Sequence, residues 1–213
     1  MADTSLVFWD WNGTLMDDVR YSVACLNGLL EEYGYEQRYS LGRYREIFGF
    51  PIEAYYRRAG FDFDRDPYPV LADSYMQRYN ADVDACPLTE GAARALETVA
   101  GRGIRQAILS VSRQDYLVQQ AGHRGIGGLF QEMLGLKDIY GAGKVDLGRQ
   151  YLAGSGADPA RCVMVGDTDH DAETARAMGV RCILYTGGHQ SRARLAATGC
   201  QLIDSLEQLP GLL

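Results

Sequence analysis

Carboxylates follow two apolar runs of the sequence, at the points where each run ends. Asp10 comes directly after LVFW, and Asp167 comes directly after CVMVG, with Asp169 and Asp171 close behind it. Several carboxylates held at one place repel each other unless a cation neutralises them, and oxygen ligands favour Mg²⁺ over zinc. These residues therefore predict a magnesium site. Aspartates also occur at helix N-termini, where the helix dipole favours them, and this is the alternative for Asp169 and Asp171.

A serine and a lysine could bind an anion beside such a site. Ser110 follows a third apolar run, and Lys144 follows a glycine-rich turn in YGAGKVDLGRQYL. Lys137 and Lys144 are the only lysines among 21 basic residues, so a lysine placed by a tight turn is unusual in this chain. Lys144 could offset an aspartate or phosphate charge, and Ser110 could donate a hydrogen bond to a phosphoryl oxygen. Taken alone, Ser110 is better explained as a helix cap or a turn residue, because serine is common after strands in both roles.

Strands that alternate with helices must position these residues. Apolar runs predict four strands, and helical patterns precede the last three of them. The strands are Leu6 to Trp9, Gln106 to Leu109, Cys162 to Val165 and Cys182 to Tyr185, and the helices are Arg94 to Ala100, Asp146 to Ala153 and Ala172 to Met178. This alternation predicts an α/β fold with a Rossmann-like parallel sheet flanked by helices. Ligands bind such sheets beyond the carboxyl ends of the strands, which is where Asp10, Ser110 and Asp167 lie.

The stretch from Asp17 to Thr89 departs from this alternation and reads as helices separated by glycines and prolines. We expect it to form a small helical cap inserted after the first strand, with residues 17–87 in the cap and residues 1–16 and 88–213 in the core. Hinges are expected near Met16 to Val19 and Pro87 to Gly91. The cap contains most of the 14 tyrosines, which in a small helical module are more often core than ligand contacts.

Composition excludes several classes of protein. The chain has 213 residues, a net charge of -7 and 23% charged residues, so it lacks the basic surface of a nucleic-acid binder. No apolar run reaches the ~18 residues of a membrane span, and no basic, apolar leader precedes the first strand. The five cysteines form no CxxC pair and are expected to be free thiols. We therefore expect a cytoplasmic protein without nucleic-acid or membrane partners; the sequence gives no indication of its oligomeric state.

Taken in order, these residues resemble the four motifs of the haloacid dehalogenase superfamily of hydrolases. DWNGTL, beginning at Asp10, is similar to the family's Asp-x-Asp-Gly-Thr, and GDTDHD, which ends at Asp171, matches Gly-Asp-x-x-x-Asp. Ser110 and Lys144 stand where the second and third motifs belong. The resemblance spans the whole chain, and the helical insert lies where the commonest cap subclass has one. FGFPIEAYYRRAGFD and TGGHQSRARLAATGCQLIDSL resemble the phosphoglycolate-phosphatase-like branch.

This resemblance implies a Mg²⁺-dependent phosphatase that hydrolyses a small phosphorylated metabolite, with phosphoglycolate or a small sugar phosphate as candidates. Asp10 would attack phosphorus and form an aspartyl-phosphate, which water would then cleave. The implied metal ligands are Asp10, Asp167, the backbone carbonyl of Asn12 and, weakly or through water, Asp171. The implied phosphate-binding groups are Ser110, Lys144 and the backbone near Gly13 and Thr14.

The sequence departs from the family pattern at Asn12, where most family phosphatases have an aspartate that protonates the leaving group and activates water. Asparagine cannot move a proton at neutral pH, and general acid–base help is typically worth ~10²–10⁴-fold in rate. One interpretation is an altered phosphatase in which Asn12 orients water, with His170 and Asp169 on the right loop to help. The other is a catalytically impaired binding or regulatory protein on the same scaffold, although the remaining motif residues favour an enzyme.

Other branches of the family fit less well. A phosphonate hydrolase also lacks the acid but depends on a cap lysine, and residues 16–90 contain none. A dehalogenase needs no Mg²⁺, whereas the acids expected to bind metal are kept here, and a sugar phosphomutase depends on the acid that is absent. Four arginines of the cap could bind a carboxylate or a second phosphate of the substrate: Arg43, Arg45, Arg57 and Arg58. Arginines on short helices, however, usually face solvent.

Overall fold

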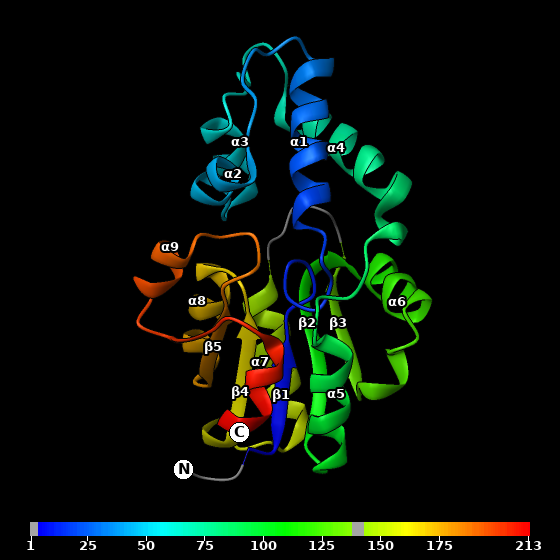
Figure 1. Ribbon diagram of the computed structural model, residues 1–213, viewed down its shortest axis with the longest axis vertical. Helices are drawn as coiled ribbons and strands as arrows, with labels where there is room; N and C mark the ends of the chain where they lie inside the picture. Colours follow the sequence, from blue (N-terminus) through cyan, green and yellow to red (C-terminus); the bar gives the residue numbers. More distant parts are fainter. Residues whose placement is uncertain (1–3, 138–142) are drawn as a thin grey trace.

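A six-stranded parallel sheet forms the centre of the molecule in the computed structural model, which describes residues 4–137 and 143–213. The strand order is β3-β2-β1-β4-β5-β6, so β1 lies between the two halves of the sheet (Figure 1). The strands are β1 (Leu6–Trp9), β2 (Arg105–Arg113), β3 (Glu132–Leu136), β4 (Cys162–Gly166), β5 (Arg181–Tyr185) and β6 (Gln201–Ile203). The predicted α/β fold with a parallel sheet is confirmed.

Helices cover both faces of this sheet because the central strands are apolar on both sides. Successive side chains of a strand point to opposite faces, so Val7 and Trp9 of β1 join one core while Leu6 and Phe8 join the other. The α-helices of this part are α5 (Ala92–Gly101), α6 (Gln114–His123), α7 (Lys144–Ser155), α8 (Asp169–Met178) and α9 (Arg192–Ala196), and the 3-10 helices are η2 (Gly127–Leu129), η3 (Pro159–Arg161) and η4 (Leu206–Leu212).

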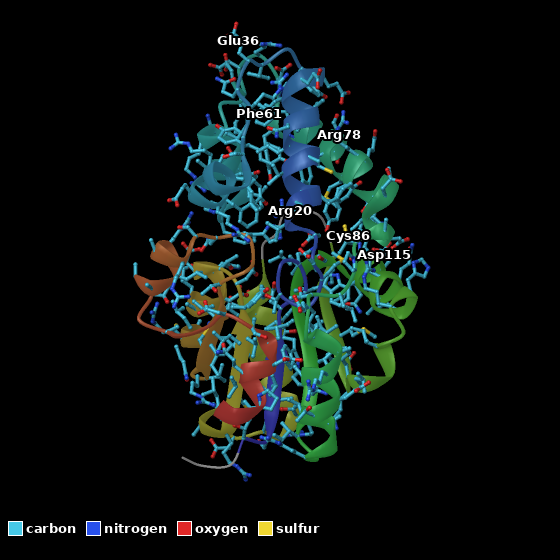
Figure 2. All side chains as sticks on the ribbon, viewed as in Figure 1. Arg20, Glu36, Phe61, Arg78, Cys86 and Asp115 are labelled. Atoms are coloured by element: carbon cyan, nitrogen blue, oxygen red, sulfur yellow. The ribbon has the colours of Figure 1, made fainter. Side chains whose placement is uncertain are left out.

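A helical module follows β1 and has a hydrophobic core of its own. It consists of α1 (Val19–Glu32), α2 (Leu41–Ile47), α3 (Ile52–Arg58), α4 (Tyr68–Asp82) and the 3-10 helix η1 (Val83–Ala85). Aromatic side chains make up much of its interior, including Tyr44, Tyr55 and Tyr56. Figure 2 shows Phe61 inside this module and Glu36 at its far tip. The predicted helical cap is therefore present, above the end of the sheet at which β1 and β4 end (Figure 1).

Two linkers run side by side between the cap and the sheet. The Asp17 N–H donates to the Pro87 carbonyl at 3.0 Å, and the Thr89 N–H donates to the Leu15 carbonyl at 2.9 Å. A β-bridge between Met16 and Leu88 lies between these bonds. These are the stretches in which the sequence predicts hinges. The domain boundary at residues 17–87 stays a prediction.

The sequence identified the four central strands and missed the two at the edges. β3 and β6 lie at the two ends of the strand order, and β6 is only three residues long. Edge strands are covered less completely, so their apolar signal is weaker. All five cysteines are unpaired, as predicted. Within the described part of the chain, no helix combines the length and apolarity needed to cross a membrane.

Candidate active site

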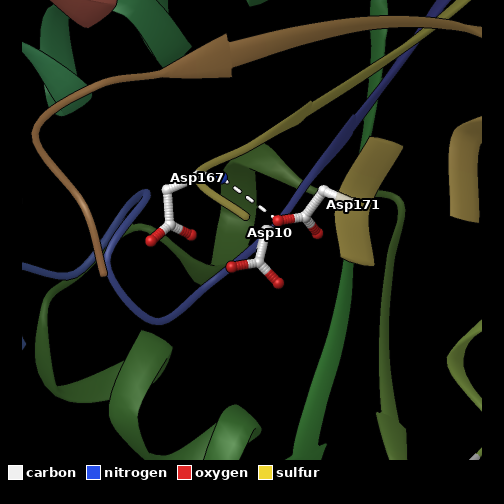
Figure 3. Close-up of side chains that lie close together, drawn as sticks. All are labelled: Asp10, Asp167 and Asp171. Atoms are coloured by element: carbon white, nitrogen blue, oxygen red, sulfur yellow. Dashed lines mark hydrogen bonds between the residues drawn. The ribbon is translucent and has the colours of Figure 1, made fainter. Parts of the chain in front are cut away.

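Three aspartates meet at the carboxyl ends of β1 and β4. Asp10 follows β1, Asp167 follows β4, and Asp171 lies in the first turn of α8. All three are buried, and one carboxylate oxygen from each lies within 4.8 Å of the others. Figure 3 shows the three side chains grouped around a common space. We call Asp10, Asp167 and Asp171 the acidic cluster.

Lys144 is the cation of this cluster. It begins α7 after Gly143, whose φ of 103° lies in the left-handed region. Its Nζ donates to Asp10 Oδ1 at 2.5 Å and to Asp171 Oδ1 at 2.6 Å, and the side chain is 2% exposed. Although burial favours the neutral amine, the adjacent Asp10 and Asp171 carboxylates raise the pKa of Lys144 above its usual value. The ammonium is therefore held in its charged form.

The remaining negative charge fits a divalent cation. Three carboxylates face one ammonium, and burial together with the neighbouring acids raises the pKa of Asp10 well above its usual value. Burial likewise raises the pKa of Asp167 to about 6. Both shifts come first from burial and then from repulsion between the acids, so a bound cation would favour the ionised carboxylates. An all-oxygen set of ligands suits a hard cation such as Mg²⁺.

Hydrogen bonds from neighbouring residues orient the carboxylates of Asp167 and Asp171. Thr14 Oγ1 donates to Asp167 Oδ1 at 3.0 Å, and the His189 N–H donates to Asp167 Oδ2 at 2.5 Å. Gly13 has a φ of 72°, and a Cβ there would lie 2.5 Å from Asp167 Oδ2, so the close approach requires glycine. Asp171 Oδ2 accepts bonds from the backbone N–H and hydroxyl of Thr168, which closes the N-terminus of α8 as a capping box.

Asn12 is held by three polar partners. Its Nδ2 donates to Asp18 Oδ2 at 3.0 Å and to the Tyr79 hydroxyl at 2.8 Å, while its Oδ1 accepts from Ser112 Oγ at 2.6 Å. Tyr79 Oη also donates to Asp18 Oδ2 at 2.5 Å. The Asn12 side chain therefore supplies an N–H₂ group to a buried carboxylate.

His189 completes this second network. Its Nε2 lies 3.2 Å from Asp18 Oδ1, and its Nδ1 lies 2.8 Å from the Tyr44 hydroxyl. The imidazole stacks on Phe48 with ring centres 4.8 Å apart. Although burial favours the neutral ring, Asp18 raises the pKa of His189 to about 9. Although burial opposes ionisation of Asp18, His189 and Tyr79 lower the pKa of that carboxyl. The two side chains therefore form a buried ion pair.

Several residues singled out from the sequence have other contacts than expected. Ser110 is fully buried, and its Oγ accepts from the Ser112 N–H at 3.0 Å. The Gly13 N–H donates to Asp18 Oδ1 at 2.8 Å, so it is not directed at a substrate here. Thr14 contacts Asp167, as described above. The predicted roles of Ser110, Gly13 and Thr14 in binding phosphate stay predictions.

Asp169 and His170, which the sequence suggests as possible aids to Asn12, also have other partners. Asp169 accepts from Arg194 Nε at 2.9 Å, and the His170 ring packs in a tilted arrangement against Phe50 of the cap, with ring centres 4.5 Å apart. Neither belongs to the acidic cluster.

Sequence reasoning missed Asp18, Tyr79, Ser112 and His189. For His189 a signal was present, because it follows the carboxyl end of a predicted strand, as Asp10 and Asp167 do.

A cavity of about 160 Å³ lies between the sheet and the cap. Asp10, Lys144 and Asp167 line its core end, together with Asn12 and Ser112. Side chains of the cap line the opposite end. The four arginines considered for substrate recognition are not among the lining residues.

A parallel sheet with clustered acids at its carboxyl edge, beneath a helical cap, defines an α/β protein with the layout of an enzyme. Residues 7–185 match the family model described as haloacid dehalogenase-like hydrolase, and the chain belongs to that family. It is 26% identical over 200 residues to a phosphoglycolate phosphatase from Synechococcus elongatus, covering 90% of this chain and 88% of that protein. It is 27% identical over 212 residues to a phosphoglycolate phosphatase from Cereibacter sphaeroides, covering 97% and 96%.

The fold is shared with a solved structure as well. A haloacid dehalogenase-like family hydrolase from Streptococcus pneumoniae superposes with a TM-score of 0.86, covering 100% of this chain and 99% of that one. The sequence identity is 19%, so this likeness concerns the fold alone. The resemblance read from the motifs is thus confirmed at the level of the family.

Proposed function

We propose that the protein is a Mg²⁺-dependent phosphatase that hydrolyses a small phosphomonoester through Asp10. The observation that carries the proposal is the buried contact of Lys144 with Asp10, which belongs to the acidic cluster. The relatives that are phosphoglycolate phosphatases support the class of reaction. Asp10, Asp167 and the backbone carbonyl of Asn12 would hold Mg²⁺, with Asp171 acting directly or through water. The metal would neutralise charge on the phosphoryl oxygens and on the carboxylates.

The protein supplies the nucleophile, a positive charge beside the phosphoryl group and a cap that excludes bulk water. A carboxylate oxygen of Asp10 attacks phosphorus, the bond from phosphorus to the ester oxygen breaks, and the leaving group departs with that electron pair. Lys144 holds Asp10 in place and adds positive charge beside the phosphoryl group. Water then attacks the aspartyl-phosphate, which releases inorganic phosphate and restores Asp10. The cap excludes bulk water from the first step.

Hydrolysis of p-nitrophenyl phosphate tests this proposal, because its leaving group needs little help from an acid. We expect turnover with Mg²⁺ that is abolished by EDTA and reduced about a thousandfold or more by Asp10→Asn. Asp73→Asn, which makes the same change at an exposed position on α4, is the matched control and should keep the wild-type rate. Undiminished hydrolysis by Asp10→Asn would disprove the assignment of the nucleophile.

The second candidate is a non-catalytic binding protein, which Asn12 favours because its side chain cannot transfer a proton. Both functions predict that Mg²⁺ and beryllium fluoride, which mimics a phosphoryl group on aspartate, together raise the melting temperature. Only the phosphatase also turns over p-nitrophenyl phosphate. Binding without turnover would therefore favour the regulatory role, and absence of both would remove the predicted site itself.

A further inference from the structure

The wall of the cavity opposite Asp10 is made of rings and aliphatic side chains. Helices α2 to α4 and the loops between them contribute these residues, among them Phe48, Phe50, Ile52, Tyr55, Tyr75 and Met76. Because the cavity is continuous from the acidic cluster to these residues, a phosphoryl group at Asp10 places the rest of the substrate among them. Figure 2 shows how densely side chains fill the cap above the core.

The cations that line the cavity are already paired with carboxylates. Among the described residues they are Lys144, His189 and Arg113. Lys144 contacts Asp10 and Asp171, and His189 contacts Asp18 as described above. Arg113 makes two bonds of 2.6 Å to Asp115. The undescribed residues, 1–3 and 138–142, contain no lysine or arginine. A carboxylate on the substrate would therefore find no unpaired cation among the described residues that line the cavity.

The cap arginines are used elsewhere. Arg57 lies 3.2 Å from Glu53 on an exposed face, and Arg58 donates to the Ile47 carbonyl at 2.9 Å. Arg45 donates to the Gly188 carbonyl at 2.8 Å, where it joins cap to core. Arg43 is exposed. Recognition of an anionic leaving group by these residues would require them to abandon these positions.

We propose that the substrate's leaving group carries an aromatic ring without a charged substituent, so that the natural substrate class is an aryl phosphate. This inference rests on the proposed phosphatase function and specifies its substrate. The cavity measures about 160 Å³ including its end at Asp10, and a cavity of about 150 Å³ in another protein is occupied by benzene, so the leaving group can be no larger than a single ring. Aromatic walls suit such a ring, since offset and edge-to-face contacts add to the burial of apolar area.

Asn12 agrees with this substrate class on independent chemical grounds. A phenol has a pKa of about 10, as the tyrosine side chain shows, whereas an aliphatic alcohol is a far weaker acid. When Asp10 attacks phosphorus, an aryl ester can release phenolate with the electron pair of the broken bond and take its proton from solvent afterwards. An alkyl ester would need a proton in that step, and the amide of Asn12 cannot provide one. The same side chain that disfavours alkyl esters therefore tolerates aryl esters.

Substrate pairs that differ in charge test the inference. We expect kcat/KM for phenyl phosphate to exceed that for phosphoglycolate by about a hundredfold or more, since both the pocket and the leaving group favour the ring. Non-hydrolysable analogues separate binding from leaving-group chemistry. With Mg²⁺ present, benzylphosphonate should raise the melting temperature more than 3-phosphonopropionate at equal concentration.

A charge placed in the aromatic wall should reverse this preference. Met76→Arg places a cation at the aromatic wall, so we expect kcat/KM for phenyl phosphate to fall about tenfold or more and the response to 3-phosphonopropionate to increase. Val70→Arg adds the same charge on the same helix, at an exposed position outside the cavity, and should leave both preferences unchanged. A comparison of melting temperatures shows whether each variant is folded.

The outcomes separate this inference from the function on which it rests. Mg²⁺-dependent hydrolysis of phosphoglycolate in preference to phenyl phosphate, or stronger stabilisation by 3-phosphonopropionate, overturns the aryl class while supporting a phosphatase. Equal effects of Met76→Arg and Val70→Arg overturn the assignment of the pocket. Failure to hydrolyse any of the phosphate esters overturns the proposed function, and the two phosphonates still report which chemistry the cavity prefers.

Discussion

The side-chain amide of Asn12 donates a hydrogen bond to Asp18, a carboxylate that was not predicted from the sequence. Its Nδ2 lies 3.0 Å from Asp18 Oδ2, and Asp18 is buried and ionised. An aspartate at position 12 would place a second carboxylate beside the first, where like charges raise pKa values and disfavour folding. An aspartate at position 12 would therefore disturb the contacts of Asp18 in this chain.

We expect Asn12→Asp alone to lower the free energy of unfolding at pH 7 by about 1–3 kcal/mol, because a hydrogen-bonded donor is exchanged for a like charge. The double variant Asn12→Asp, Asp18→Asn removes the like charge but also the carboxylate that pairs with His189, so its loss of stability should be smaller than the sum of the two single losses. It should also raise the rate on alkyl phosphates, since position 12 then carries an acid. Urea denaturation and kinetics of all four proteins in the cycle measure both effects. Additive losses in the double variant would contradict the pairing of Asn12 with Asp18.

The Thr14 hydroxyl orients Asp167, a predicted metal ligand, and a valine at this position would remove the hydroxyl alone. Thr14→Val removes the bond to Asp167 Oδ1 with little change of shape. We expect the Mg²⁺ concentration needed for half-maximal activity to rise about 10–100-fold, as is usual when a contact behind a metal ligand is lost. Thr174→Val is the matched control, because Thr174 is also buried and its Oγ1 has no hydrogen-bond partner among the described residues. If both variants bind Mg²⁺ like wild type, Thr14 does not act through the metal site.

The central strands could be predicted from sequence because each is a short apolar run that ends in a turn. Asp10 and Asp167 were found by the same rule, since the carboxyl ends of neighbouring parallel strands meet at one edge. The network around Asn12 could not be found this way. Asp18 and Tyr79 are 61 positions apart and meet only because the cap folds back over β1. Contacts of this kind follow from the tertiary arrangement of the cap and leave no local pattern.

The loop after β5 holds α2 of the cap on the core. Arg45 Nε donates to the Gly188 carbonyl at 2.8 Å, and its Nη2 donates to the Gly187 carbonyl. The Ser191 N–H returns a bond to the Arg45 carbonyl at 3.3 Å. A cap that must open for substrate and close for chemistry can be regulated by such contacts.

We expect Arg45→Ala to weaken closure, raising KM and lowering kcat for p-nitrophenyl phosphate together, by about three- to tenfold each. Amide hydrogen exchange in α2 should become faster, because the helix loses its attachment to the loop. Arg43→Ala removes an exposed arginine from the same helix and serves as the control. Unchanged exchange in Arg45→Ala would show that closure does not depend on this residue.

At the scale of the whole molecule, the buried pair of His189 and Asp18 joins two parts that the sequence places far apart. Asp18 precedes α1 at the first linker, and His189 lies on the loop that follows β5. Tyr44 of α2 contacts the other ring nitrogen of His189, so the imidazole contacts both the linker and the cap. The backbone N–H of His189 donates to Asp167 of the core. Ionisation of this ring is therefore linked to the packing of the cap against the core.

This linkage predicts a stability that falls with rising pH. The pKa of His189 is about 9 in the folded protein and about 6.5 in an unfolded chain. A group whose pKa is raised by folding stabilises fully below its unfolded pKa, and that contribution is lost as pH rises through the folded pKa. We expect a loss on the order of 2–3 kcal/mol between pH 6.5 and 9.5, measured by urea denaturation in EDTA. His189→Gln should be less stable at pH 6.5 and show a flatter profile, whereas His123→Gln, on the exposed side of α6, should follow wild type. Parallel profiles for wild type and His189→Gln would mean that the ring does not carry the charge that ties the cap to the core.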